Sequence, residues 1–286
     1  MLVSDVCQGL GPVARGTIKQ LRIVQIFPKT TPIANSPAIG LAGEENARAI
    51  LGTVPVEADG SARFRVPALK PIFFQALDGQ GYAYQTMRST TYLQPGETTS
   101  CVGCHEQRMS APPAAASFAL ALRRAASEIE PGQWGGRPFS FVEVVQPVLD
   151  RHCIACHGRQ KTEGGVDLTG VPQQGFTRSY WTLCGVKSAD GRLVRGGDPA
   201  KLWVPRFWMR NQIQATPPDG GYGARGSRLM KLLCQGPGHY GVKLADGDVR
   251  RLAAWIDLNA VFYGAYASAE QAKEVQGKRI AIPKIQ

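Results

Sequence analysis

The chain has 286 residues, 43% of them hydrophobic, and a formal net charge of +11 at pH 7, so it can bury the cores of two domains and is not disordered as a whole. Its Lys and Arg residues are scattered rather than set in a stripe among aromatic residues, which argues against nucleic-acid binding. No run of eighteen apolar residues occurs, so we expect no direct membrane span.

The first hundred residues predict β-structure. Residues 16–27 ("GTIKQLRIVQIF") set apolar side chains among polar ones, and residues 71–93 predict two strands around an Asp78-Gly79 turn. Between them, residues 50–66 predict a hairpin. A three-residue loop over 58–60 would place its apolar side chains on one face, with the pairs Val54–Phe64 and Val56–Ala62.

Residues 110–138 are rich in Ala, Pro and Gly, which predicts a linker with one short helix. We therefore expect a β-rich domain over 1–124 and a mostly helical domain over 125–286.

In the second domain, residues 146–158 ("QPVLDRHCIACHG") predict a helix with Pro147 in its first turn. Residues 246–260 predict an amphipathic helix with Asp246 or Asp248 as its cap and first-turn acid. The intervening residues 216–227 ("TPPDGGYGARGS") predict an irregular loop. The predicted fold class is α+β.

The strongest chemical signal is a repeated Cys-x-x-Cys-His pattern, "CVGCH" at 101–105 and "CIACH" at 153–157. In c-type haem attachment the two cysteines form thioethers and the histidine ligates the iron. We predict two covalent haems c, whose propionates would offset part of the positive charge. The expected binding residues are Cys101, Cys104 and His105 for the first haem, and Cys153, Cys156 and His157 for the second.

A zinc site made of the two Cys pairs is the main alternative. It is disfavoured because 48 residues separate Cys104 from Cys153, whereas a zinc ribbon expects about 15 to 20. Zinc would also leave both trailing histidines unexplained. Of the remaining cysteines, Cys7 is the odd one, and Cys184 and Cys234 either form a disulfide or act as small buried hydrophobic residues.

Two histidines, His152 and His239, remain for the other faces of the haems. His152 directly precedes Cys153 and cannot reach the far face of the second haem. A hydrogen bond is its expected role, and ligation of the first haem is the alternative. His239 lies in a Gly-rich loop, where the backbone can approach a flat ligand closely, so we expect it to complete a six-coordinate second haem.

The first haem has no obvious sixth ligand. Its candidates are Met87, Met109 and His152, although a methionine more often packs in a core than ligates a metal. The alternative is an open iron face that binds a small molecule. Expected neighbours of this haem are Tyr82, Tyr84, Arg88 and Glu97.

Several segments resemble the haem-bearing middle and C-terminal regions of hydrazine synthase α subunits. They are "GTVPVEADGSARFRVPA", "LDGQGYAYQTMRS", "PGETTSCVGCHE", "VQPVLDRHCIACHG" and "GVKLADGDVRRLAAWIDLNA". The resemblance covers nearly all of the chain and leaves out the N-terminal propeller of the family. The strand pattern predicts that the first domain is a small antiparallel β-sandwich, and the resemblance implies a β-rich domain that holds one unusual haem, followed by a cytochrome c-like domain in which His157 and His239 ligate the second iron.

The resemblance also implies a zinc ion near the first haem and a tyrosine ligand four residues beyond the first motif. This chain has Met109 at that position, so we expect ordinary ligation by His105 and do not transfer hydrazine chemistry.

Electron transfer by a dihaem c-type cytochrome is the expected function, because no cluster of general acids or bases is evident. The alternatives are a haem-dependent oxidoreductase that acts on a small nitrogen compound or peroxide at an open first haem, and a binding module without haem. Covalent haem implies a periplasmic or otherwise exported protein, whose leader is not in this sequence. The basic charge implies an anionic redox partner, and the oligomeric state stays open.

Overall fold

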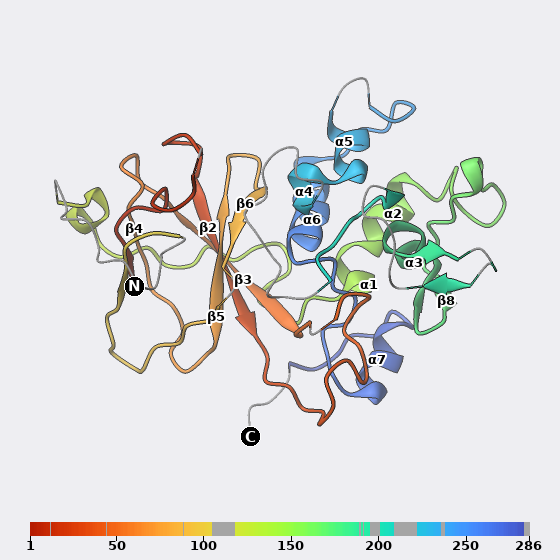
Figure 1. The fold of residues 1–286 in the computed structure, drawn as a ribbon, viewed down its shortest axis with the longest axis horizontal. Coiled ribbons are helices and arrows are strands. Elements are labelled where there is room, and N and C mark those ends of the chain that lie inside the picture. The colour runs from red at the N-terminus through yellow and green to blue at the C-terminus, as the bar shows by residue number, and fades with distance from the viewer. Residues whose placement is uncertain are drawn as a thin grey trace. The chain divides into compact units, whose positions relative to one another are not determined.

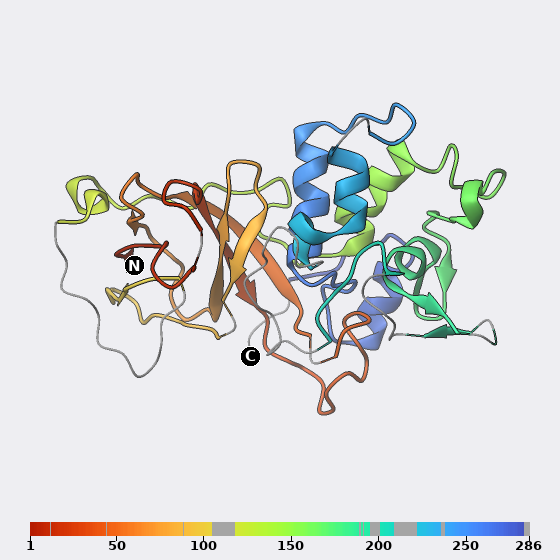
Figure 2. The same cartoon turned by 45° about the horizontal axis from the view of Figure 1, so that its top comes forward.

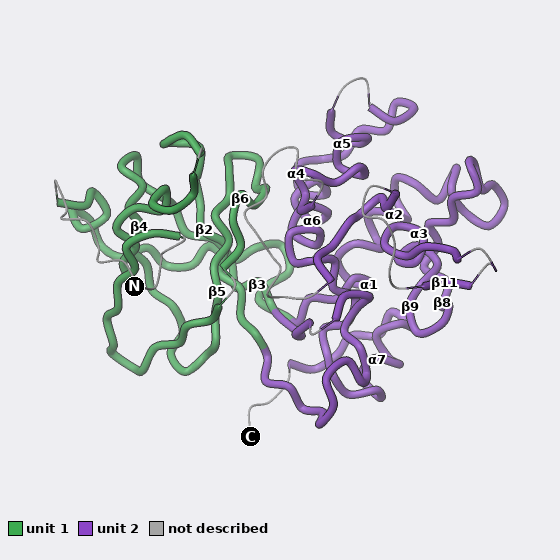
Figure 3. The backbone as a smooth tube through the Cα atoms, in the orientation of Figure 1, with its two compact units in different colours: residues 1–26, 49–137 green, residues 27–48, 138–286 purple. Residues whose placement is uncertain are grey.

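The computed structural model describes residues 1–11, 13–43, 45–87, 89–104, 118–188, 190, 192–194, 201–208, 222–235 and 238–282. The chain divides into two compact units, coloured separately in Figure 3. Unit 1 comprises residues 1–26 and 49–137, and unit 2 comprises residues 27–48 and 138–286. The mixture of strands and helices confirms the α+β class, and the domain boundary expected after residue 124 stays a prediction.

Unit 1 is built on a four-stranded sheet in the order β3-β2-β5-β6 (Figure 1). Its strands are β2 (Gln20–Ile26), β3 (Arg48–Pro55), β5 (Ile72–Leu77) and β6 (Ala83–Thr86). β5 runs antiparallel to both β2 and β6. The β5–β6 turn forms because Asp78 Oδ1 accepts hydrogen bonds from the backbone N–H groups of Gln80 and Tyr82, at 2.9 and 3.0 Å. The strands predicted in residues 16–27 and 71–93 are therefore confirmed.

One face of this sheet carries the core of unit 1. Leu21 and Ile23 lie on it because alternate residues of a strand face the same side, and Phe74 faces them from β5. Phe64 meets Phe74 edge to face, with ring centroids 5.7 Å apart. Each such side chain stabilises the fold by about 1.5–3 kcal/mol through burial.

A second, three-stranded sheet has the order β4-β1-β7. Its strands are β1 (Leu2–Val3), β4 (Ala62–Arg63) and β7 (Ser100–Cys101). β1 pairs antiparallel with β4 and parallel with β7. The N-terminal strand thus fixes the entry to the first Cys-x-x-Cys segment.

The turn of the hairpin predicted over residues 50–66 forms, but the predicted pairing of its two strands is wrong. In the turn, Glu57 N–H donates to Ser61 O at 2.8 Å and Gly60 has a φ of 87°. However, β3 pairs with β2 and β4 pairs with β1, so the pairs Val54–Phe64 and Val56–Ala62 do not form. Strands from elsewhere in the chain take the backbone groups of both arms, while the apolar side chains still reach the same core.

Unit 2 is mainly helical. Its helices are α1 (Phe141–Val144), α2 (Gln146–His152), α3 (Arg178–Cys184), α4 (Gly223–Gly226), α5 (Arg228–Cys234), α6 (Asp246–Asp257) and α7 (Ser268–Glu274), with a short helix η2 (Glu163–Gly165). Two small ribbons pair β8 (Pro172–Gln173) with β9 (Phe176–Thr177), and β10 (Val186–Lys187) with β11 (Leu193–Val194). The linker to this unit contains the predicted short helix, η1 (Leu120–Arg123).

The two predicted helices of this unit are confirmed, with corrections at their edges. α2 has Pro147 in its first turn. The N-cap of α6 is Ala245, so Asp246 and Asp248 are first-turn acids and neither caps the helix. Within the loop predicted over 216–227, residues 223–226 form α4, because the N–H of Ala224 donates to Asp257 of α6 at 2.8 Å.

The core of unit 2 is an aromatic cluster. Phe141 of α1 stacks on Phe262 with ring centroids 5.3 Å apart, and Tyr180 of α3 meets both rings edge to face. Trp255 of α6 and Phe176 complete the cluster. Because Phe141, Tyr180 and Trp255 come from three different helices, the cluster holds α1, α3 and α6 together; Figure 2 shows the helices of this unit in a second view.

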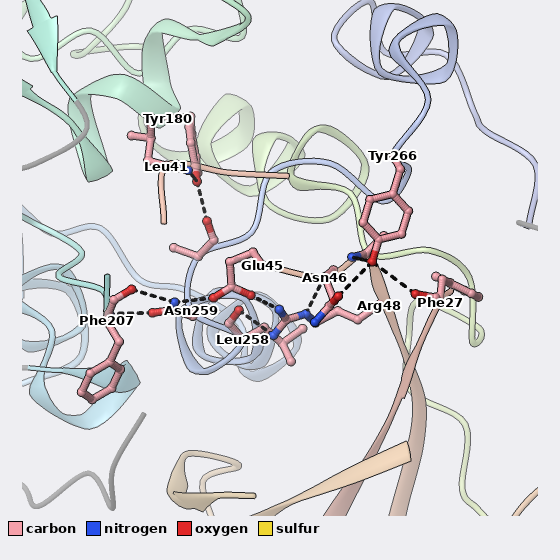
Figure 4. Close-up of polar contacts among 12 residues, drawn as sticks. Phe27, Leu41, Glu45, Asn46, Arg48, Tyr180, Phe207, Leu258, Asn259 and Tyr266 are labelled. Atoms are coloured by element: carbon pink, nitrogen blue, oxygen red, sulfur yellow. Dashed lines mark hydrogen bonds and ion pairs between the residues drawn. The ribbon is translucent and has the colours of Figure 1, made fainter. Parts of the chain in front are cut away.

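Residues 27–48 belong to unit 2 through buried polar contacts, shown in Figure 4. Glu45 forms an ion pair with Arg48 and accepts a hydrogen bond from the side chain of Asn259. Tyr266 OH donates to Phe27 O at 3.2 Å and accepts from Ala47 N–H at 3.0 Å. Such buried groups stabilise a fold only when they are paired, so this segment is an integral part of unit 2.

Across the residues that the structure describes, no helix combines the length and apolar character needed to cross a bilayer.

Candidate functional site

The second Cys-x-x-Cys-His motif continues the path of α2. The N–H of His157 donates to Cys153 O at 2.9 Å, and the N–H of Cys156 donates to the same oxygen at 3.1 Å. This turn brings both cysteines and the histidine to one end of α2. Burial, and next the nearby Asp150, raise the pKa of Cys153 to about 11, so its sulfur is a neutral thiol at pH 7.

His157 faces His239, which lies 82 residues further along the chain. Their Nε2 atoms are 3.4 Å apart, and the two rings are inclined by only 19° with centroids 5.7 Å apart. The distance between the ring centroids equals the Nε2–Nε2 distance plus the distance from centroid to Nε2 in each ring. The two nitrogens therefore point at each other along the line that joins the rings. The structure therefore brings together the two residues that the sequence predicts as ligands of the second iron.

The loop around His239 depends on unusual backbone geometry. Gly238 and Gly241 have φ angles of 75° and 78°, and Tyr240 between them has a φ of 46°. The left-handed region favours glycine because a Cβ is crowded there. These turns present the His239 ring to His157.

The Nε2–Nε2 distance of 3.4 Å lies just beyond the usual length of a hydrogen bond and short of the roughly 4 Å that two in-line metal–imidazole bonds of about 2.0 Å would give. A hydrogen bond from nitrogen is usually about 2.7–3.2 Å long. The pair also leaves His157 Nδ1 buried without a hydrogen bond in the described part of the chain, an arrangement that costs about 1–3 kcal/mol. Fold stability alone does not explain it.

His152 makes the hydrogen bond expected of it, with Asp248 of α6 as its partner. His152 Nε2 and Arg151 Nη1 lie 2.9 and 2.7 Å from Asp248 Oδ2. Burial raises the pKa of this carboxyl, but the hydrogen bonds from His152 and Arg151 outweigh it, so the pKa of Asp248 lies below its usual value. These contacts fasten the end of α2, where the motif begins, onto α6. Ligation of the first haem by His152 stays a prediction, and no local sequence signal marks Asp248 as its partner.

The first motif is held by the N-terminal residues of the chain. The N–H groups of Ser4 and Asp5 donate to the carbonyls of Cys101 and Val102, at 2.9 and 3.0 Å. A Cβ at Gly103 would lie 2.5 Å from the carbonyl oxygen of Gln8. Only glycine allows these two segments to approach so closely.

The thiols of the first motif lie against the core of unit 1. Cys101, Cys104, Cys7 and Met87 all pack on it. Burial, followed by the neighbouring Cys101 and Cys7, raises the pKa of Cys104 to about 12. Cys7 is therefore a neighbour of the first motif, which the sequence does not predict.

The other residues predicted around the first haem are spread more widely. Tyr82 is buried and Tyr84 is half-buried, whereas Glu97 is exposed and accepts a hydrogen bond from Gln94 N–H. His105, Met109 and Arg88 lie outside the described residues.

Cys184 and Cys234 do not form the disulfide considered for them. Cys184 is buried and Cys234 is exposed, and no disulfide joins them in the structure. Burial raises the pKa of Cys184 to about 12 although Arg206 opposes it, as for a small core residue. Within the described ranges no three His, Cys, Asp or Glu side chains gather as a metal-binding group.

Comparisons with known proteins support the expected resemblance. Residues 16–106 match the family model described as the hydrazine synthase alpha subunit middle domain. Hydrazine synthase subunit alpha of Kuenenia stuttgartiensis is 32% identical over an alignment of 107 residues, which covers 32% of this chain and 13% of that protein. A solved structure of Kuenenia stuttgartiensis hydrazine synthase matches with a TM-score of 0.57 and 20% identity, covering 92% of this chain and 43% of that chain.

The middle-domain residues therefore resemble the hydrazine synthase alpha family in sequence, and nearly the whole chain shares a fold with the solved enzyme. The chain spans less than half the length of either relative.

Proposed function

We propose that the chain is a c-type cytochrome with two covalent haems that transfers electrons in the periplasm or another compartment outside the cytoplasm. The observation that carries the proposal is a facing pair of histidines. His157 directly follows the second Cys-x-x-Cys, and its Nε2 lies 3.4 Å from Nε2 of His239. A haem held there supplies a reversible one-electron couple.

Each residue of the second motif has a distinct part in this proposal. Cys153 and Cys156 would tether the group at the end of α2, and His157 and His239 would hold its iron. With two protein ligands on the iron, the group would suit electron transfer rather than substrate binding. The Asp248 contacts to Arg151 and His152 keep the tether fixed relative to α6 and limit movement of the ligands.

A haem-dependent oxidoreductase is the second candidate function, with the first haem as its site. The chain has four histidines, and the two outside the motifs are both engaged within unit 2: His239 faces His157, and His152 bonds to Asp248. No imidazole is then left to close the far face of the first haem. An open iron there would bind a small nitrogen compound or peroxide. The name hydrazine synthase describes the relatives, and Met109 in place of a tyrosine keeps us from transferring that reaction.

A carbon monoxide titration of the dithionite-reduced protein separates these functions. Haem content is measured by pyridine haemochrome, and binding is followed in the Soret region. Two haems with no carbon monoxide bound would support an electron carrier. Binding to half of the haem would favour the oxidoreductase, and a protein without haem would refute both.

The assignment of His239 has its own test. His239→Ala should add one carbon monoxide per chain, because it opens one face of the second iron. Lys243→Ala, in the same loop, is the matched control and should add none. An unchanged titration of the His239 variant would contradict its role as a ligand. His152→Ala adds a carbon monoxide only if His152 ligates the first haem.

A further inference from the structure

We infer that a basic surface on unit 2, next to the His239 loop, is the docking site of an acidic redox protein. This surface, called the α5 surface below, comprises Lys201, Trp203, Arg228 and Lys231. The inference rests on the proposed electron-transfer function and adds where the partner binds and what its chemistry is.

The α5 surface is formed by two segments that contact each other directly. The N–H of Leu229 donates to Trp203 O at 3.1 Å, and Arg228 Nη1 donates to Lys201 O at 3.1 Å. The guanidinium of Arg228 lies over the ring of Trp203, 4.7 Å from its centroid. Lys201 and Trp203 therefore contact α5 directly and share one surface with it.

Its charge is of one sign. Residues 201–208 and 222–235 contain five Lys or Arg and no Asp or Glu. Arg206 is buried and donates to the carbonyl of Cys184, whereas Lys201 and Arg228 are exposed and Lys231 is half-buried. A surface with cations and no interspersed acids attracts an anionic partner.

An aromatic side chain adds contact area to this charge. Trp203 is half-buried beneath Arg228. Tryptophan and arginine are the residues that most often dominate binding energy at protein interfaces. A protein partner is favoured over a membrane because Leu229 and Met230 of α5 are buried in the core and Leu232 and Leu233 are half-buried, which leaves little apolar area to insert.

The α5 surface is also placed suitably for electron transfer. α5 ends at Cys234, five residues before His239, and both α4 and α5 contact α6. These three helices lie side by side in both Figure 1 and Figure 2. A protein bound on α5 is therefore next to the chain segment that holds the second iron. Redox encounters bury little area, below about 1,200 Å² in total, so such a partner needs only a small contact surface.

The test uses the haem-loaded protein and two probes. Poly-glutamate represents an acidic protein surface, and ferricyanide is an anionic oxidant whose reaction with the reduced protein is followed by stopped flow. We compare wild type with Lys201→Glu/Lys231→Glu. The matched control, Lys19→Glu/Arg65→Glu, makes the same change in net charge at exposed residues of unit 1.

At an ionic strength of about 10 mM, where charges act over about 30 Å, poly-glutamate should bind the wild type and slow its oxidation. The α5 variant should lose about tenfold in both poly-glutamate affinity and ferricyanide rate, and the difference should shrink at about 150 mM. The control should behave like the wild type. Trp203→Ala, which keeps the charge, should also weaken poly-glutamate binding at the higher salt.

Equal losses in the α5 variant and the control would overturn the inference, because net charge alone would then explain them. Vesicles of phosphatidylcholine with one-fifth phosphatidylserine provide a further arm. If they sediment the wild type and not the α5 variant, the surface binds membranes and the protein partner is refuted. A protein without haem by pyridine haemochrome would instead refute the proposed function, so the two failures are distinguishable.

Discussion

Replacing Glu274 by Gln should remove a pH dependence from the stability of unit 2. Glu274 lies at the end of α7 and is 1% exposed. Its Oε1 accepts a hydrogen bond from Gly264 N–H at 2.8 Å. Its Oε2 and the hydroxyl of Ser140 are buried without a hydrogen bond of normal geometry in the described part of the chain, although Ser140 is near enough to affect the carboxyl. Burial is the largest effect and raises the pKa of Glu274 to about 8, against the opposing effects of Gly264 and Ser140.

The sign and size of the effect follow from proton binding. Between pH 4.5, the ordinary pKa of this group, and about pH 8, the folded chain keeps a proton that the unfolded chain has lost. The contribution of Glu274 is therefore fully present below pH 4.5 and is lost as the pH rises through 8. At about 1.36 kcal/mol for each pKa unit, raising the pH from about 5 to about 8 should lower the free energy of unfolding by about 3–4 kcal/mol.

Urea denaturation followed by circular dichroism at several pH values measures this effect. Gln keeps the shape of the neutral acid and the acceptor for Gly264, so the difference between variant and wild type isolates Glu274. Glu270→Gln is the matched control, because Glu270 is on the same helix, is partly exposed and pairs with Lys273. Parallel pH curves for wild type and Glu274→Gln would refute the reasoning.

Three further predictions concern other parts of the chain. Gly52→Ala should destabilise unit 1 by more than about 2 kcal/mol, because Gly52 has a φ of 148° and an added Cβ would lie 2.1 Å from the carbonyl oxygen of Glu130; an unchanged Tm would contradict this. Asp248→Asn should cost about 1–3 kcal/mol in urea at pH 7, and because the pKa of Asp248 is lowered, this difference should vanish as the pH falls through the folded-state pKa. In the haem-free chain, iodoacetamide should modify the exposed Cys156 well before Cys104, whose pKa burial raises to about 12, since the thiolate is the reactive form; equal rates by mass spectrometry would be the opposite result.

Elements with local causes could be predicted from the sequence. α2 begins beside Pro147, which suits a first turn, and the β5–β6 turn follows from the side chain of Asp78. The hairpin over 50–66 could not be predicted, because its two arms pair with β2 and β1 instead of with each other. Competition between distant strands leaves no trace in the local alternation of apolar residues.

The residues of the candidate site also fall into those that the sequence indicates and those that it does not. The motif spacing and a count of histidines were enough to single out His239, although its role as a ligand stays a prediction. The partners that the sequence did not indicate are far from the motifs along the chain: Asp248 binds His152 from 96 residues away, and Cys7 lies beside Cys104. Such contacts depend on tertiary packing and on single residues of common types.

The division of unit 2 into residues 27–48 and 138–286 affects the order in which the protein can form. Residues 27–48 are synthesised before unit 1 is complete, and their partners Asn259 and Tyr266 come more than two hundred residues later. At about 5–20 residues per second, the ribosome needs tens of seconds at its slower speeds to reach them. Throughout that time the distant partners of Glu45 and Arg48, namely Asn259 and Leu258, are not yet available. Unit 2 is thus the last part of the protein to fold completely. Because residues 49–137 of unit 1 lie between its two segments, a single cut in the chain cannot separate unit 2 from all of unit 1.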